Sequence, residues 1–241
     1  MIRFFKKIRK QLVANNNIQI YLKYAIGEIL LVMIGILLAL QVNNWNENQK
    51  LKDQELKALK ELQADLEQSL EDIVGDKRIF ERSMSSNQII LDQMERSSPY
   101  QDSLNPHFAI LFPFSTFSIN STTFDNITRS GVNLISNDSL RISISDFYTS
   151  YVNLYKELEQ RVLIEHNNNY VKPMLMSAFS TYQFQSMVPR DYNSFINNPE
   201  YRQVLNFNVT VLGGIIEFQG SLIKTITRII DQLKNEIEHM S

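Results

Sequence analysis

Residues 24–42 form an apolar run, YAIGEILLVMIGILLALQV, which is followed by the polar sequence NNWNEN. The hydrocarbon core of a bilayer is about 30 Å thick, and roughly 20 helical residues are needed to cross it. Nine of the twelve residues from 29 to 40 are Leu, Ile or Val. Each of these favours insertion by roughly 0.3–0.6 kcal/mol, and their sum outweighs a cost of about 3 kcal/mol for Glu28. The run therefore predicts one transmembrane helix, a signal anchor within residues 18–43.

Charge predicts which end of this helix faces the cytoplasm. Residues 1–23 carry six basic side chains and no acidic one, whereas the rest of the chain carries 18 basic and 26 acidic side chains. Basic residues beside a span stay on the cytoplasmic side. We therefore expect residues 1–17 to be a basic amphipathic cytoplasmic segment and residues 44–241 to be an extracytoplasmic helical domain. The basic segment is either an orientation signal or a helix that lies among anionic headgroups.

A basic start followed by an apolar run is also found in cleaved targeting segments. A cleaved signal peptide fits poorly, because the apolar stretch is long and Ala39-Leu40-Gln41 is not a small-x-small cleavage site. A mitochondrial presequence is also basic and free of acids, but it does not explain a span of this length. The sequence therefore favours an anchor that stays in the protein.

Four residues are candidates for contact with the membrane or with a partner: Glu28, Gly35, Ala39 and Trp45. An ionisable residue inside a span is by default a candidate for function. Glu28 lies about one turn inside the expected cytoplasmic boundary, so it is either an interfacial carboxylate or a contact with a partner helix. Gly35 and Ala39 have the small-xxx-small spacing that lets helices approach closely, and Trp45 suits the outer aromatic belt.

The segments MIRFFKKIRKQL and YLKYAIGEILLVMIGILLALQVNNWNE, within residues 1–47, carry a family resemblance. They resemble the opening of a family of uncharacterised single-span membrane proteins from Bacteroidota, a domain of unknown function. A looser match covers TTFDNITRSGVNLISNDSLR at 122–141, where members tend to have a second small residue after the glycine and this chain has Val132. The resemblance implies a bacterial inner membrane with the large domain in the periplasm. It implies no activity and no catalytic residue.

The composition after the span favours an all-α fold. Seven Gly and six Pro in 241 residues leave long uninterrupted stretches, which suit helices better than a turn-rich sheet protein. The absence of cysteine excludes disulfides, thiol catalysis and zinc–thiolate sites. We therefore expect a single N-terminal transmembrane helix followed by an extracytoplasmic antiparallel helical bundle within residues 44–241.

The sequence after the span predicts a long first helix. Neither Gly nor Pro occurs from residue 36 to residue 74, so the helix is expected to continue out of the span and to be kinked or broken near Gly75. Its expected buried stripe consists of Leu59, Leu62, Leu66, Leu70, Ile73, Phe80 and Met94. Its charges, including Lys57, Glu61, Asp65 and Glu71, form either a solvated face or the register of a coiled-coil dimer.

A proline-interrupted segment, residues 97–121, carries most of a group of five phenylalanines: Phe108, Phe112, Phe114, Phe117 and Phe124. Irregular chain rarely carries so much apolar area unless it packs on something. Either the segment folds back and closes the bundle, or Phe108, Phe112, Phe114 and Phe117 form a recognition surface on a loop.

Capping signals predict a short helix, a corner and a second helix within residues 122–141. Thr122 and Asp125 have the spacing of a capping box, and Gly131 suits the left-handed residue that ends a helix. Ser136 or Asn137 can cap the helix that follows.

Two further helices are expected after this corner. The first runs from about Ser139 to Val171, with Tyr151, Tyr155 and Val162 near its buried side, and is kinked or ended by Pro173. The last helix is capped by Asn198-Pro199-Glu200 and runs toward His239. Gly213-Gly214 within it predicts close helix packing or a kink.

The search for catalytic or metal-binding patterns is negative, so no catalytic, cofactor-binding or metal-binding residue is predicted. There is no GxSxG, no HExxH and no phosphate-binding loop. Glu236-x-x-His239 is half of a di-iron helix motif without its second copy. His107 and His166 have no ligand-spaced neighbours and are expected to be polar surface groups or satisfied core groups.

The sequence thus favours a membrane-anchored, non-enzymatic interaction or scaffold protein. The alternative is a ligand-binding sensor that acts through a membrane partner, and an enzyme is a third hypothesis. The expected partners are the lipid bilayer and a protein, or a second copy of the chain, that binds through the span or the bundle. No nucleic-acid partner and no cofactor is expected.

Overall fold

The computed structural model describes residues 18–240 apart from 114, 116–118, 131–133, 181–182 and 184. The described residues are mostly helical, and no strand forms among them beyond an isolated bridge between Phe179 and Pro189. The chain divides into two compact units, Met1–Gln54 and Glu55–Ser241. The prediction of an all-helical protein is confirmed for the described residues. The predicted basic segment, residues 1–17, lies outside them.

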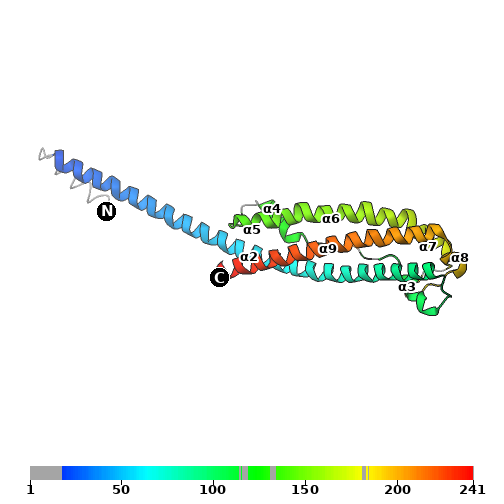
Figure 1. The fold of residues 1–241 in the computed structure, drawn as a ribbon. Helices are drawn as coiled ribbons and strands as arrows, with labels where there is room; N and C mark the ends of the chain where they lie inside the picture. The colour runs from blue at the N-terminus through cyan, green and yellow to red at the C-terminus, as the bar shows by residue number, and fades with distance from the viewer. Residues whose placement is uncertain are drawn as a thin grey trace. The chain divides into compact units, whose positions relative to one another are not determined.

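Helix α2 (Ile18–Arg96) is one α-helix of 79 residues (Figure 1). The expected continuation of the apolar run into the charged sequence as a single helix is confirmed. Of the two outcomes predicted near Gly75, a kink or a break, the break does not occur. Helical glycine costs about 1 kcal/mol relative to alanine. Ile73 and Phe80, on either side of Gly75, are 0% and 1% exposed, so packing in the core holds the helix on both sides of the glycine.

A residue in the left-handed conformation ends α2. Ser97 has a φ of 45°, and the Ser98 N–H donates a hydrogen bond to the Gln93 carbonyl at 3.2 Å. This is the arrangement of a Schellman motif, whose left-handed position is usually glycine because a Cβ is disfavoured there. Pro99 follows and cannot continue the helix.

Helix α9 (Pro199–Met240) is the long helix at the end of the chain (Figure 1). Its N-terminus is capped as the sequence predicts. The Asn198 Oδ1 accepts hydrogen bonds from the backbone N–H groups of Glu200 at 2.9 Å and Tyr201 at 3.2 Å.

The glycine pair within α9 brings no neighbour unusually close. A Cβ at Gly213 would lie 3.9 Å from the Met84 Sδ, and a Cβ at Gly214 would meet nothing within 4 Å. Since both positions have room for a side chain, the predicted close packing at this pair is wrong.

Helices α2 and α9 lie along each other in the second unit. The Arg202 guanidinium donates to the Met94 carbonyl at 2.7 Å, and the Asn208 Nδ2 donates to the Asn87 Oδ1 at 2.9 Å. The Lys234 Nζ lies 3.4 Å from a carboxylate oxygen of Glu67. The contacting residue on α2 falls in number as the residue on α9 rises. The two helices therefore run in opposite directions where they touch.

A third helical stretch contains three π-helical segments. It consists of α5 (Asp138–Asp146), η3 (Phe147–Tyr151), α6 (Val152–Leu158), η4 (Glu159–Ile164), η5 (Asn167–Val171) and α7 (Lys172–Ala178), of which η3, η4 and η5 are π-helical. A π turn contains an extra residue and so changes which side chains face the core. Tyr151 and Val162, expected near the buried side, are 42% and 39% exposed, whereas Leu163 is 1% exposed.

Pro173 does not end this third stretch, contrary to one of the expected outcomes. It lies in the first turn of α7, where a missing N–H costs least, and helix continues to Ala178. The stretch begins as predicted, because the Asn137 Oδ1 accepts a hydrogen bond from the Leu140 N–H at 3.1 Å.

Shorter elements connect the long helices. They are η1 (Asp102–Leu104), α3 (Asn105–Ala109), α4 (Thr122–Ser130) and α8 (Tyr192–Ile196). Thr122 is the first residue of α4 rather than its cap. The Asn120 Oδ1 accepts from the Thr122 N–H at 3.1 Å, and the Ser121 Oγ donates to Asp125 at 3.0 Å. The predicted capping box of Thr122 and Asp125 therefore does not form, because Asp125 instead accepts from Ser121, which precedes the helix. Gly131 lies outside the described residues.

The apolar stripe predicted for α2 lies in the core of the second unit. Six of its residues are at most 1% exposed and Leu70 packs against them. The stripe meets α9 residues that include Leu205, Leu212, Ile226, Ile230 and Leu233 and third-stretch residues that include Phe147, Tyr155 and Leu163.

We predict that Ser97→Gly stabilises the chain by about 1 kcal/mol, because glycine adopts the left-handed conformation without a Cβ penalty. The measurement is chemical unfolding of the full chain in detergent. Ser98→Gly is the matched control, since no positive φ occurs at that position, and it should not stabilise. Equal gains from both substitutions would contradict the assignment of the strain to Ser97.

Candidate functional site

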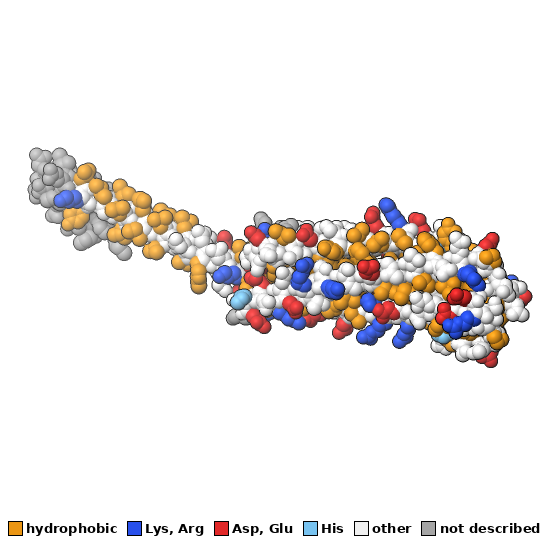
Figure 2. Space-filling model, viewed as in Figure 1, with side chains coloured by type: hydrophobic (Ala, Val, Ile, Leu, Met, Phe, Trp, Pro, Cys, Tyr) orange, Lys and Arg blue, Asp and Glu red, His pale blue; other side chains and the backbone are white. Residues whose placement is uncertain are grey.

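The first unit exposes an apolar segment of α2. Its large apolar side chains from Leu22 to Trp45 are 51–74% exposed, and Figure 2 shows hydrophobic side chains along this part of the helix. A patch of this size is unusual on a soluble monomer and marks a surface that another phase or molecule covers.

Two of the described helices, α2 and α9, are long and apolar enough to cross a membrane. They differ in what covers them. The most apolar window of α9 is 33% buried, and α9 contributes Leu212, Leu222 and Ile226 to the core of the second unit. The corresponding window of α2 is 0% buried. Packing in the core explains why α9 is apolar. No described residue covers the apolar window of α2.

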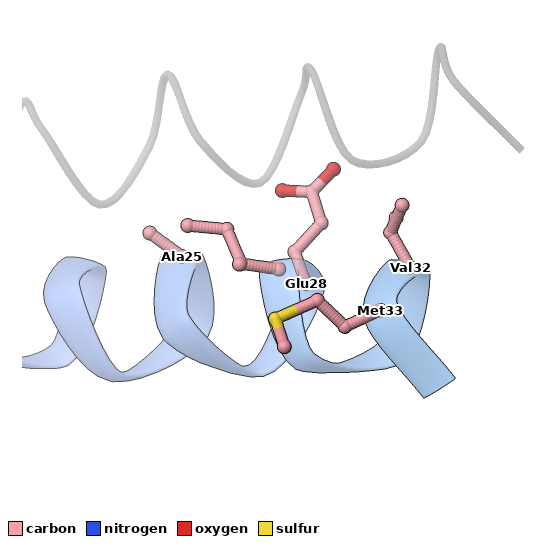
Figure 3. A pocket seen from close by; sticks show the side chains of 5 residues that line it. Ala25, Glu28, Val32 and Met33 are labelled. Carbon is pink, nitrogen blue, oxygen red and sulfur yellow. The ribbon is translucent and has the colours of Figure 1, made fainter. Parts of the chain in front are cut away.

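Glu28 lies within this apolar segment (Figure 3). Together with Ala25, Ile29, Val32 and Met33 it lines a shallow hollow of about 320 Å³. Ala25, Glu28 and Val32 extend to the same side of α2, as their i, i+3 and i+7 spacing requires. Among the described residues, the hollow is lined by one face of α2.

The other three candidates of the span are also on the surface of α2. A Cβ at Gly35 would meet nothing within 4 Å, so a second helix has room to approach there. Ala39 is exposed, and the Trp45 side chain is 69% exposed.

Phe108 and Phe112 are core residues, so neither offers a surface to a partner. They are 1% and 8% exposed, and the Phe108 ring lies 5.3 Å from that of Phe179 and 5.4 Å from that of Phe195. Their segment folds back onto the helices, which is the first of the two interpretations of the phenylalanine cluster. Phe114 and Phe117 lie outside the described residues.

Buried polar side chains meet at one backbone carbonyl, which we call the Leu111 node. The Leu111 carbonyl accepts hydrogen bonds from the Ser83 Oγ at 3.1 Å, the Asn87 Nδ2 at 2.7 Å and the Asn208 Nδ2 at 2.8 Å. Ser83, Asn87 and Asn208 are at most 1% exposed. The node therefore joins α2, α9 and the segment after α3 inside the core.

The Leu111 node is one of several ties between α2 and the described residues of 107–136, which we call the strap. The Ser86 Oγ lies 3.0 Å from the His107 Nδ1, and the Ser115 Oγ donates to the Asp76 carboxylate. The Asp65 carboxylate accepts from the Asn120 Nδ2 at 2.8 Å and from the Thr123 N–H at 3.1 Å. The Glu55 carboxylate accepts from the Ser136 N–H at 2.6 Å. The strap thus runs along α2 in the opposite direction. Asp65 binds the strap, so its assignment to a solvated face is corrected.

The sequence carried a signal for these ties that apolarity alone does not reveal. Residues spaced alternately by three and four positions lie on the same face of a helix. On α2 this spacing places five polar residues on the same face as Leu59, Leu62 and Leu66: Glu55, Ser69, Asp76, Ser83 and Asn87. The same spacing along α9 includes Asn208 and Gln219. Polar residues in buried stripe positions need partners, and here the strap and the neighbouring helices supply most of them.

Two buried tyrosines of the second unit, Tyr148 and Tyr155, form hydrogen bonds through their hydroxyl groups. The Gln219 Nε2 donates to the Tyr155 hydroxyl at 3.0 Å, and the Tyr148 hydroxyl donates to the Asn120 carbonyl of the strap at 3.2 Å. Burial raises the pKa of both phenols, so both are neutral at physiological pH. They are packing residues with a polar end rather than an exposed stacking platform.

The two histidines of the second unit that the sequence singled out differ in their surroundings. The His107 Nδ1 lies 3.0 Å from the Ser86 Oγ. His166 is 5% exposed, and neither of its ring nitrogens has a hydrogen-bond partner among the described residues. Burial lowers the pKa of the His166 imidazole. The expectation of a surface or satisfied group therefore holds for His107 and is wrong for His166.

Two further charged side chains, Glu236 and Arg141, form hydrogen bonds or an ion pair within the second unit. Glu236 accepts a hydrogen bond from the Asn137 Nδ2 at 2.5 Å, which joins α9 to the start of α5. Arg141 pairs with Asp138 at 2.7 Å and donates to the Ile135 carbonyl at 3.1 Å. Within the described part of the chain, no three His, Asp or Glu side chains are grouped so as to hold a metal ion.

These observations define an all-helical protein with an uncovered apolar helix segment long enough to cross a membrane. The chain belongs to a family of unknown function, DUF6090, which matches residues 28–188. The match begins at Glu28, contains the apolar run from there to Val42 and the whole strap, and ends before α9. No curated protein and no solved structure matches the chain.

We predict that the Leu111 node depends on the asparagines rather than on the serine. Asn208→Leu leaves the Asn87 Oδ1 buried without its donor and should destabilise the chain by about 1–3 kcal/mol. Ser83→Ala should change stability by less than about 0.5 kcal/mol, because the carbonyl keeps two donors for its two lone pairs.

The measurement is chemical unfolding of the full chain, with hydrogen exchange of residues 107–113 as the local readout. Equal losses from Asn208→Leu and Ser83→Ala would contradict this ranking.

Proposed function

We propose that the protein is a single-span, membrane-anchored and non-enzymatic interaction or scaffold protein. The observation that carries the proposal is the apolar segment of α2 from Leu22 to Val42, whose large side chains are all at least half exposed. A bilayer is the solvent that suits a helix that is apolar on all sides. The proposed second part is an antiparallel helical bundle formed by α2, the third stretch and α9.

The proposed orientation places the N-terminus in the cytoplasm and the bundle in the periplasm of a bacterial cell. It is supported by the six basic and no acidic side chains in residues 1–23. The likeness to single-span proteins of Bacteroidota supports the inner membrane as the location. In this orientation the bundle meets periplasmic partners and the span meets partners within the bilayer.

Exposed apolar side chains on the second unit support a protein partner. Tyr151, Leu154 and Val162 on the third stretch are 39–49% exposed, and Tyr170 and Phe207 are 55% and 53% exposed. Aromatic and aliphatic side chains of this kind form the centres of protein interfaces. The partner is a second protein or a second copy of the chain.

A ligand-binding sensor that acts through a membrane partner is the second candidate. It is favoured by acceptor atoms in the core, the Asn208 Oδ1 and the Gln219 Oε1, that have no partner among the described residues. Unpaired buried acceptors are unusual and are met by an ordered water or by a bound polar molecule.

Site-specific photo-cross-linking in native membranes tests the interaction proposal. A photoreactive residue in place of Leu154 or Phe207 should give a discrete adduct of defined mass, because these side chains offer apolar area to a partner. The matched controls are Lys156 and Lys224, which are exposed on the same two helical stretches. A lack of adducts at Leu154 and Phe207, or equal adducts at all four positions, would contradict a specific partner.

A further inference from the structure

His166 is an unusual residue for the interior of a helical protein. It is 5% exposed, and both its Nδ1 and its Nε2 lack a hydrogen-bond partner among the described residues. A buried polar group without a partner destabilises the fold, and an apolar side chain of similar size would not carry that penalty. The position therefore retains an imidazole at a cost in stability, and the property that an imidazole adds is its titration between pH 5 and pH 8.

Two aromatic rings contact the His166 imidazole. The Phe207 ring of α9 meets it edge to face at a centroid distance of 4.9 Å, and the Tyr170 ring lies 5.6 Å away at an angle of 32°. Phe207 and Tyr170 are themselves 53% and 55% exposed. His166 is therefore only one side chain below the surface, so the ring has a short path to water.

The backbone around His166 is irregular on both sides. Segment η4 (Glu159–Ile164) ends two residues before it, and segment η5 (Asn167–Val171) begins directly after it. Both are π-helical, and π turns are rare, less favourable than α turns and frequent at functional sites. The imidazole is thus flanked on both sides by less favourable helical turns, which favours local opening there.

We propose that His166 is a pH-sensitive latch between the η4–η5 stretch and α9. When neutral, the imidazole packs beneath Phe207 and holds the two helices together. When protonated, the imidazolium has no acceptor for its two N–H groups in this site and moves toward water, which opens the contact with α9.

The groups that face His166 are consistent with this latch. Its own helical stretch contributes the Tyr170 ring, and α9 contributes the Phe207 ring. Burial is the cause that lowers the pKa of His166. Because neither ring nitrogen has a hydrogen-bond partner among the described residues, protonation and burial of the imidazole oppose each other.

The direction of the pH effect follows from the lowered pKa. The unfolded or opened chain binds the proton more tightly than the closed one, since an unperturbed histidine has a pKa of about 6.5. The latch is therefore fully closed above about pH 6.5 and is weakened as the pH falls below that value. The opening equilibrium constant can rise by up to about tenfold for each pH unit between the two pKa values.

Hydrogen exchange and unfolding of the full chain in lipid nanodiscs between pH 7.5 and pH 5.0 test the latch. Acidification should lower the protection factors, which are exchange rates corrected for the intrinsic pH dependence of amide exchange, of residues 159–171 and of α9 around Phe207 in the natural chain. His166→Leu should be at least as stable at pH 7.5 and should lose this pH-dependent opening. His107→Gln is the matched control and should keep it.

Equal acid-induced opening in the natural chain and in His166→Leu would overturn the proposal. Imidazole NMR of the natural chain gives a second test that requires no variant. With three histidines in the sequence, each can be assigned. A His166 pKa at or above about 6.5 would also overturn the proposal, because burial would then not disfavour the charged form.

Discussion

The structure depends on how α2 distributes its apolar side chains. From Leu22 to Val42 they occupy all sides of the helix, whereas from Leu59 to Met94 they form one stripe with polar residues opposite. A helix that is apolar on all sides is stable in lipid or within a large core, and a striped helix is stable against other helices in water. One uninterrupted α-helix therefore has one part suited to a bilayer and another part suited to a helical core.

Polar residues within the α2 stripe give the second unit its particular arrangement. Asp76, Ser83 and Asn87 occupy stripe positions and bind the strap, so the strap has one register along α2. A buried hydrogen bond contributes only about 1 kcal/mol net, but an unmade one is more costly, so alternative registers are disfavoured. The apolar contacts hold the helices together, and these ties determine which part of the strap meets which turn of α2.

Local patterns in the sequence predicted the elements that local interactions decide. The cap at Asn198, the cap at Asn137 and the apolar stripe of α2 depend on neighbours within a few residues, and each occurs as expected. Tertiary packing decides the features that were missed. The helix continues through Gly75 because of its neighbours in the core, the π turns alter the buried face near Val162, and the burial of His166 depends on contact with α9. The hydrophobic pattern also overlooked polar residues such as Asn87 and Asn208, because it recorded only apolar side chains at stripe positions.

Cysteine accessibility tests most directly the claim that lipid covers one part of α2 and protein covers the other. The chain contains no cysteine, so each single-cysteine variant carries one thiol. In intact spheroplasts, a membrane-impermeant maleimide should leave every position from 29 to 40 unlabelled, should label Leu51→Cys and Lys52→Cys, and should show labelling that repeats every three to four residues between 56 and 94. Periodic labelling between 29 and 40 would show that protein or water, rather than lipid, surrounds this segment and would contradict the account.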